Sequence, residues 1–188
     1  MSHQNNNPLS AATLTLANRQ RRQPIRLHLL RQIAAHLLVE QCGLRAYDLS
    51  LCLLAAPAMT RLNERFVGHA GCTDVITFDY SAKVGPASRR TGHGRHASGS
   101  GRRDAGPTLC GEIFICVDEA VLQARRFRTS WPSEVVRYLV HGVLHLRGYD
   151  DLQPAARRRM KRQENRLLRA LAARFSLSQL ERHAKLQP

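Results

Sequence analysis

Residues 141–151 have the sequence HGVLHLRGYDD, which predicts a helix that ends in a turn. His141 and His145 are four residues apart, so they share one face of a helix. Gly148 can adopt the positive φ of a helix C-cap, after which the chain turns back. Apolar residues on this segment can bury the helix in a core, and they are Val136, Leu139, Val140, Val143 and Leu144.

This helix and its turn predict a metal site. Two imidazoles on one helix face can bind a single ion, and the turn can bring Asp150 or Asp151 towards it. The spacing of His141, His145 and Asp151 matches the three ligand positions of a known zinc template. We therefore predict these three residues as metal ligands, and the two histidines also as catalytic residues. Asp150 is the alternative third ligand, and two hydrogen-bonded histidines in a buried helix are the simpler interpretation.

The residue after His141 distinguishes this site from a protease. Proteolytic zinc enzymes with this pattern carry glutamate there, and it acts as the general base. This chain has Gly142 instead, so the sequence argues against a metalloprotease. We also expect Gly142 to leave room beside the metal for a bulky substrate.

Strands and helices alternate before this helix, and the chain then finishes with helices alone. Alternating and β-branched residues predict strands at 12–17, 47–55, 73–78 and 109–117. Helical spacing and prolines predict helices from Pro24, over 57–66, over 118–127 with Asp118 as its cap, over 130–148, and over 154–174. This order favours an α+β fold, a small mixed β-sheet packed against helices, with the metal site on a helix and the turn after it.

The length of 188 residues suits one domain with tails. Residues 1–11 are rich in asparagine and serine, which predicts a disordered N-terminal tail. We expect a single domain over residues 12–175 and a C-terminal tail over 176–188. Residues 81–109 hold six of the twelve glycines and six basic residues, which predicts a flexible basic insertion. That insertion is either a tolerated surface loop or an arm that contacts RNA.

The charge of the chain indicates a polyanionic partner. Lysine and arginine number 29 against 14 acidic residues, a net charge of +15. Residues 152–174 carry eight basic residues and one acidic residue, and the insertion 81–109 carries six and one. Aromatic residues make up only 5% of the chain, which argues against a platform that stacks many bases.

Several absences indicate a cytoplasmic protein without a membrane segment. No apolar run in the sequence is long enough for a bilayer-spanning helix. The first ten residues, MSHQNNNPLS, lack the basic and then apolar order of a signal peptide. The five cysteines are an odd number without a CxxC pair, so we expect reduced, mostly buried thiols.

The stretch 141–151 resembles the signature H-G-x-L-H-L-x-G-Y-D-H of the YbeY family of bacterial endoribonucleases, and eight of its nine specified positions agree. Three more segments resemble the family in the same order along the chain. Residues 62–78 are similar to its L-N-x-x-(Y/F)-R-G-x-x-x-x-T-D-V-L-S-F segment, 111–115 to its G-D-I-x-I strand, and 160–164 to its M-x-x-x-E helix. The resemblance spans roughly residues 47–172.

The resemblance implies a single α+β domain that holds one zinc ion through three histidines. It implies cleavage of single-stranded RNA in 16S rRNA 3′-end maturation and in ribosome quality control. The implied partners are therefore single-stranded RNA, 16S rRNA and the small ribosomal subunit. His141 and His145 match the first two zinc ligands. Glu164 lies on the inward stripe of the last helix, where it could orient a ligand imidazole or pair with an arginine.

The chain departs from the family pattern at two positions. Asp151 stands where the family has the third histidine, so manganese or magnesium becomes possible beside zinc. Val67 stands where the family has an arginine in its cleft, and valine cannot bind a phosphate as arginine does. His69 or Arg65 could take that role.

These observations together predict a metal-dependent endoribonuclease that acts on ribosomal RNA. The alternative is an RNA-binding ribosome-assembly factor without cleavage, whose metal site is structural or vestigial. RNA cleavage that responds to a chelator distinguishes the two.

Overall fold

The computed structural model describes residues 12–81 and 108–182. The predicted N-terminal tail, almost all of the predicted insertion 81–109, and residues 183–188 of the predicted C-terminal tail lie outside the described residues. Within the described part of the chain, no helix is long and apolar enough to cross a membrane.

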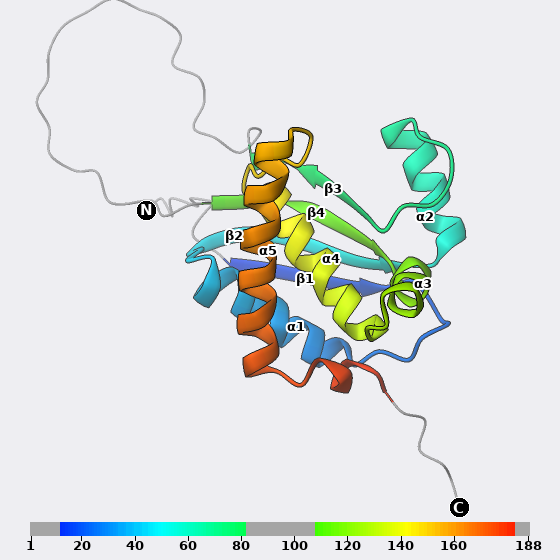
Figure 1. Cartoon of the computed structure of the whole chain (residues 1–188), viewed down its shortest axis with the longest axis horizontal. Helices are drawn as coiled ribbons and strands as arrows, with labels where there is room; N and C mark the ends of the chain where they lie inside the picture. Colours follow the sequence, from blue (N-terminus) through cyan, green and yellow to red (C-terminus); the bar gives the residue numbers. More distant parts are fainter. Residues whose placement is uncertain (1–11, 82–107, 183–188) are drawn as a thin grey trace, which may run out of the picture.

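A four-stranded mixed sheet forms the centre of the molecule, in the order β1-β2-β4-β3 (Figure 1). Strands β1, β2 and β4 are parallel, and β3 pairs with β4 in the antiparallel sense. The strands span Ala12–Asn18 (β1), Ala46–Leu54 (β2), Val75–Asp79 (β3) and Thr108–Cys116 (β4). The predicted α+β class with a small mixed sheet is therefore confirmed, and all four predicted strands are present.

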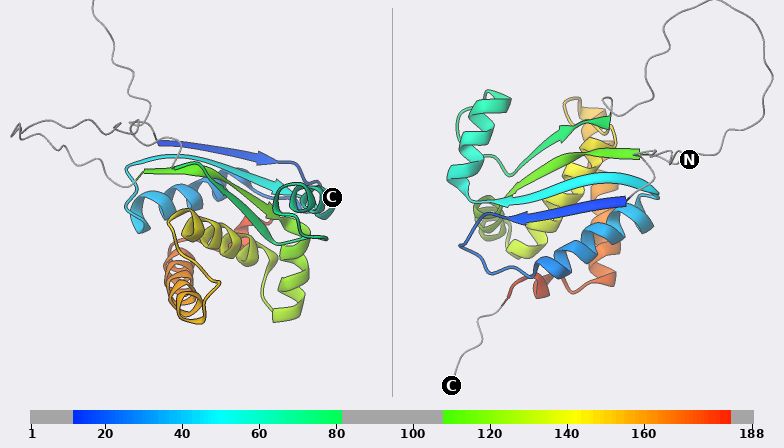
Figure 2. Two further views of the ribbon diagram at one scale, coloured as in Figure 1. Left: turned by 90° about the horizontal axis from the view of Figure 1, so that it is seen from above. Right: turned by 180° about the vertical axis from the view of Figure 1, so that it is seen from behind.

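Four helices lie on the same side of this sheet (Figure 2). They are α1 (Leu27–His36), α3 (Val117–Phe127), α4 (Trp131–Leu146) and α5 (Pro154–Arg174). Helix α2 (Ala56–Leu62) contacts a separate, smaller apolar cluster that includes Cys52, Leu54 and Ile76. Three short helical segments of other types complete the described chain. They are η1 (Leu37–Gln41) after α1, η2 (Asn63–Val67) after α2 and η4 (Leu177–Leu180) after α5.

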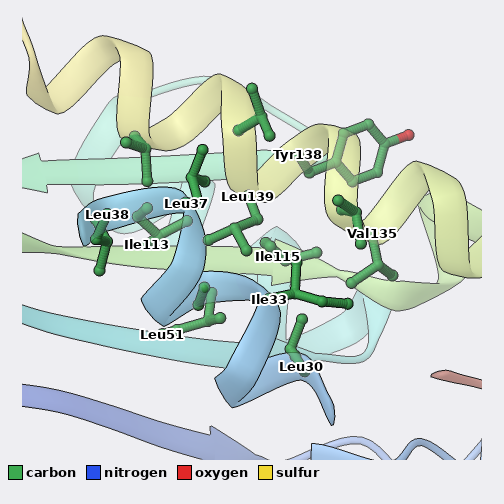
Figure 3. Close-up of a cluster of buried hydrophobic side chains, with 14 of the residues drawn as sticks. Leu30, Ile33, Leu37, Leu38, Leu51, Ile113, Ile115, Val135, Tyr138 and Leu139 are labelled. Carbon is green, nitrogen blue, oxygen red and sulfur yellow. The ribbon is translucent and has the colours of Figure 1, made fainter. Parts of the chain in front are cut away.

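The main core lies between the sheet and α1 and α4. Alternate residues of β2 and β4 face these helices, and Leu51, Ile113 and Ile115 are fully buried there (Figure 3). Side chains around most of the circumference of α4 are buried, as expected for a helix enclosed on several sides. Because α4 cannot rotate without unpacking this core, the face that carries His141 and His145 is fixed.

Two predicted helix starts differ from the structure. Asp118 does not cap α3, because β4 runs directly into the helix and Cys116 occupies the N-cap position. Instead, Asp118 Oδ2 accepts a hydrogen bond of 2.7 Å from the backbone amide of Ala56, which ties α3 to the start of α2. The first helix begins at Leu27 rather than Pro24, because Ile25 forms a β-bridge with Glu181.

The β-bridge between Ile25 and Glu181 attaches part of the predicted C-terminal tail to the rest of the structure. Leu180 of η4 is fully buried in the main core, and Arg182 N donates to Pro24 O at 2.8 Å. The division of the chain into one domain and two tails remains a prediction, but residues 177–182 contact the core.

Gly142 has a different role from the one that we expected. A Cβ atom at this position would lie 3.0 Å from Ile113 Cγ2 and 3.1 Å from Thr77 Cγ2. The glycine therefore faces the sheet, and it does not open space beside the metal residues. It allows α4 to approach β3 and β4 closely, and a glutamate side chain would not fit at this position.

Gly111 on β4 makes an even closer approach, which predicts a measurable cost of substitution. An added Cβ would lie 2.5 Å from the backbone oxygen of Phe78 and 2.9 Å from Leu146 Cδ2. We expect Gly111→Ala to lower the free energy of unfolding by about 2 to 3 kcal/mol, because backbone cannot yield as a side chain can. Gly142→Ala is the comparison variant. It should lower the free energy of unfolding by less, since the atoms nearest to its added Cβ belong to side chains. Urea unfolding measures both, and an equal or smaller loss for Gly111→Ala would contradict this packing.

Candidate metal centre

The two histidines of α4 present their Nε2 atoms to each other. His141 Nε2 lies 3.0 Å from His145 Nε2, and the two rings are inclined by 76°. Both side chains are partly buried on the helix face that points towards α5 and the turn after α4. The four-residue spacing seen in the sequence thus produces a pair of converging nitrogen atoms.

The other ring nitrogen of each histidine has an acceptor as its partner. His141 Nδ1 lies 3.2 Å from Glu164 Oε2, and His145 Nδ1 lies 3.2 Å from the backbone oxygen of Tyr149. A carboxylate and a carbonyl only accept hydrogen bonds, so both Nδ1 atoms carry the proton. When both rings are neutral, each has a lone pair at Nε2, and the two Nε2 atoms face each other at 3.0 Å, as two nitrogen ligands of one ion would. This donor pair therefore fits a divalent metal ion.

The turn after α4 adds a carboxylate to the pair. Gly148 has a φ of 79°, and Tyr149 N donates to Leu144 O at 3.0 Å, which closes the helix and reverses the chain. One ligand atom each from His141, His145 and Asp151 lies within 4.8 Å of the other two. The structure thus brings the three predicted ligands together, and their ligand roles remain a prediction.

Asp150, the alternative third ligand, has a different partner. Its Oδ1 accepts a hydrogen bond of 2.9 Å from Leu152 N, and the residue is exposed. The cluster of possible metal-binding side chains found among the described residues contains Asp151 and not Asp150.

Glu164 on α5 contacts the His141 ring at Nδ1, the ring nitrogen that does not face His145. Its side chain is buried and accepts hydrogen bonds from Lys161 Nζ at 2.7 Å and from Arg137 Nη1 at 2.9 Å, beside the one from His141. Burial by itself raises the pKa of Glu164, but the hydrogen bonds from His141, Lys161 and Arg137 outweigh it and lower the pKa to about 2. Glu164 therefore makes both contacts expected from the sequence, one to the imidazole of the predicted ligand His141 and one to Arg137.

His145 is kept in the neutral form that a metal ligand requires. Burial is the largest cause that lowers its pKa, and the neighbouring His141 lowers it further. The Asp151 carboxylate and the Tyr149 carbonyl act in the opposite direction but do not outweigh these causes.

A cleft of about 250 Å³ opens beside these residues. Besides the predicted site residues, its walls contain side chains that were not predicted as site residues, namely Asp74, Arg137, Tyr138, Arg157, Met160 and Lys161. Arg137 could have been found, because it precedes His141 by one helical turn. Asp74 lies in the family-like segment 62–78, but only the folded sheet shows that residues before β3 come next to α4.

Val67 stands where the family has an arginine, and its two predicted substitutes, Arg65 and His69, line different hollows in the structure. Val67 is exposed at the end of η2 and lines a different depression from the metal cleft, together with His69, Cys72 and Thr77. Arg65 lines a third hollow, with Arg61 and Phe66. Of the two substitutes predicted for the arginine, only His69 shares the depression of Val67.

Comparisons with known proteins match this chain to one family. The family model described as Endoribonuclease YbeY matches residues 15–172. The chain is 34% identical over 142 residues to the Endoribonuclease YbeY of Salinibacter ruber, covering 76% of this chain and 81% of the relative. It is 32% identical over 143 residues to the protein of the same name from Chlorobium phaeovibrioides, with the same coverages of 76% and 81%.

The fold has a counterpart among solved structures. A solution structure of a Thermotoga maritima protein superimposes with a TM-score of 0.56 and covers 94% of this chain and 100% of its own. The two sequences are only 18% identical, so this similarity concerns the fold alone.

Proposed function

Because this chain belongs to the YbeY endoribonuclease family, we propose that it is a metal-dependent endoribonuclease that cuts single-stranded RNA. We further propose that its substrate is the 3′ end of 16S rRNA in the small ribosomal subunit, in the cytoplasm, and that it serves ribosome quality control. The catalytic unit proposed is the domain over residues 12–175. The observation that carries the proposal is the pair of Nε2 atoms 3.0 Å apart, with Asp151 beside them.

His141, His145 and Asp151 would hold one zinc ion, and the carboxylate would also accept manganese or magnesium. A bound ion of this kind supplies a Lewis acid for a phosphoryl oxygen and makes a nearby water more acidic. Glu164 and the Tyr149 carbonyl keep the two imidazoles in the tautomer that directs Nε2 to the ion.

The positive side chains of the cleft suit an RNA backbone. Arg137, Arg157 and Lys161 line the same hollow as His141, and α5 continues the basic surface beyond it. Such contacts bind phosphates with little dependence on sequence and weaken as salt increases. They would hold the scissile phosphate next to the metal ligands.

A ribosome-assembly factor that binds RNA without cutting it is the second candidate. Two observations favour it, namely the aspartate at the third ligand position and the exposed Val67 where the family has arginine. Both proposals predict RNA binding, so the distinguishing result is a metal-dependent cleavage product.

Variants of Asp151 test the proposed ligand set. We expect Asp151→Ala to lower metal affinity by at least about 100-fold. The loss of a residue that only hydrogen-bonds a metal ligand has a smaller effect, because it removes no ligand atom. Asp151→His should retain the ion, because imidazole is also a zinc ligand, and should cleave RNA better than Asp151→Ala. Competition with a chromogenic chelator measures the affinities.

Asp150→Ala is the matched control for Asp151→Ala, since it changes the neighbouring carboxylate outside the cluster. If Asp150→Ala loses the ion and Asp151→Ala keeps it, the ligand assignment is wrong.

A further inference from the structure

A second hollow of about 500 Å³ adjoins the metal cleft. The two share four residues of their walls, which are Asp74, Arg137, Tyr138 and Lys161. The part that belongs to the second hollow alone is lined by Gln123, Phe127, Thr129, Glu134 and Asn165. The part of the second hollow that the metal cleft does not share is therefore lined by an aromatic ring, two side-chain amides, a hydroxyl and a carboxylate.

Phe127 is held at this hollow although most of its side chain is in water. It is the last residue of α3 and is 61% exposed. Arg128 follows it with a φ of 55°, the one positive φ of a non-glycine residue in the described ranges. An arginine in this conformation is disfavoured, so the turn needs support. Thr129 provides it, because its amide donates to Ala124 O at 3.0 Å and its hydroxyl donates to Glu134 Oε1 at 2.6 Å.

Tyr138 supplies a polar group without a partner in the described part of the chain. The residue is only 5% exposed, and no described residue forms a hydrogen bond with its hydroxyl. Figure 3 shows the hydroxyl directed away from the apolar cluster of the core. A buried hydroxyl without a partner is costly, and it is usually satisfied by protein, water or a ligand. Tyr138 lines both hollows, so a ligand that passes between them lies against its side chain.

We propose that the second hollow binds one unpaired base of the RNA, adjacent to the nucleotide at the metal cleft. The base stacks on Phe127, and the amides of Gln123 and Asn165 lie within reach of its polar edge. Arg137 and Lys161, which also pair with Glu164, lie in the wall common to both hollows, where they contact the phosphate that joins the two nucleotides. The low aromatic content of the chain agrees with one base rather than a series. This inference rests on the proposed function, since it assumes an RNA substrate.

A pair of variants on α3 isolates the contribution of the ring. We expect Phe127→Ala to weaken the binding of a fluorescent single-stranded RNA by about 5- to 20-fold, within the range measured for base stacking. Leu122→Ala is the matched control, because Leu122 is 57% exposed on the same helix and lies outside the hollow. Phe127→Trp should retain binding. The measurement uses the full chain with chelator at one salt concentration, so that the RNA stays intact.

An abasic scan of the RNA shows whether a single base is recognised. In the unaltered protein, removing the base at one position should weaken binding by a similar factor, and the other positions should matter less. In Phe127→Ala, removal of that same base should have no further effect, because the contact is already lost. Equal binding of Phe127→Ala and Leu122→Ala, or no position that stands out in the unaltered protein, would overturn the proposal.

The failure of this inference and of the proposed function can be distinguished. Metal-dependent cleavage without a position-specific base effect contradicts the base pocket alone. A position-specific effect that disappears in Phe127→Ala, with no cleavage in any divalent metal, supports the pocket and contradicts the endoribonuclease.

Discussion

The variant His141→Ala is expected to lose both its metal ion and its cleavage of RNA. His141 supplies one of the two converging Nε2 atoms, and no other described histidine lies within the cluster to replace it. We expect the cleavage rate to fall by at least about 100-fold, because the group lost belongs to the proposed reacting centre. Metal analysis of the purified variant and a gel assay of RNA products measure the two effects.

The same variant should also lose the stabilisation that metal gives to the native state. Added zinc should raise the melting temperature of the unaltered protein, because it binds the folded form alone. In His141→Ala the added zinc should have little effect. His28→Ala is the control, since His28 is an exposed histidine on α1, outside the cluster. Retention of one ion per chain in His141→Ala would contradict the site.

The second large effect is expected for Glu164. Glu164→Ala removes the carboxylate that accepts hydrogen bonds from Arg137, Lys161 and His141, and leaves Arg137 with Glu134 as its remaining carboxylate partner. Loss of one partner from a fully buried pair costs about 3 to 5 kcal/mol, and here the partly exposed cations reduce this to about 2 to 3 kcal/mol. Urea unfolding measures the loss, and Glu64→Ala, at an exposed position, should be nearly neutral.

The lowered pKa of Glu164 adds a pH dependence to this prediction. The pKa is about 2 in the folded protein against 4.5 for the ordinary carboxyl, so the folded state favours the ionised form. This stability is fully present above about pH 4.5 and is lost as the pH falls towards 2. Glu164→Gln should therefore show a smaller loss of stability over this range than the unaltered protein. An unchanged acid slope in Glu164→Gln would contradict the assignment.

The sequence predicted those features that depend on local spacing. The pair His141 and His145, the turn at Gly148 and the four strands follow from periodicity within a few residues of chain. Glu164 was found as a carboxylate on an apolar stripe, which is again a local pattern. The buried α4 then fixed these residues in space, and the structure brought Asp151 to the histidines.

Features that depend on neighbours distant in sequence were missed or misread. Gly142 was read as free space beside a metal, because only the folded sheet reveals Ile113 at 3.0 Å from its Cβ position. Asp118 was read as a helix cap, because its actual partner, Ala56, lies 62 residues away. Phe127 and Tyr138 had no signal in the sequence, since their significance comes from a hollow formed between α3, α4 and α5.

The most direct test of the central claim is a titration of RNA cleavage with metal. The purified protein is stripped with chelator, zinc is returned in known amounts, and cleavage of a single-stranded RNA is measured at each step. The account predicts that cleavage stops on stripping and returns in proportion to bound metal, up to one ion per chain, and that His141→Ala does not recover. Cleavage that survives the chelator, or metal that binds fully without producing cleavage, would contradict it.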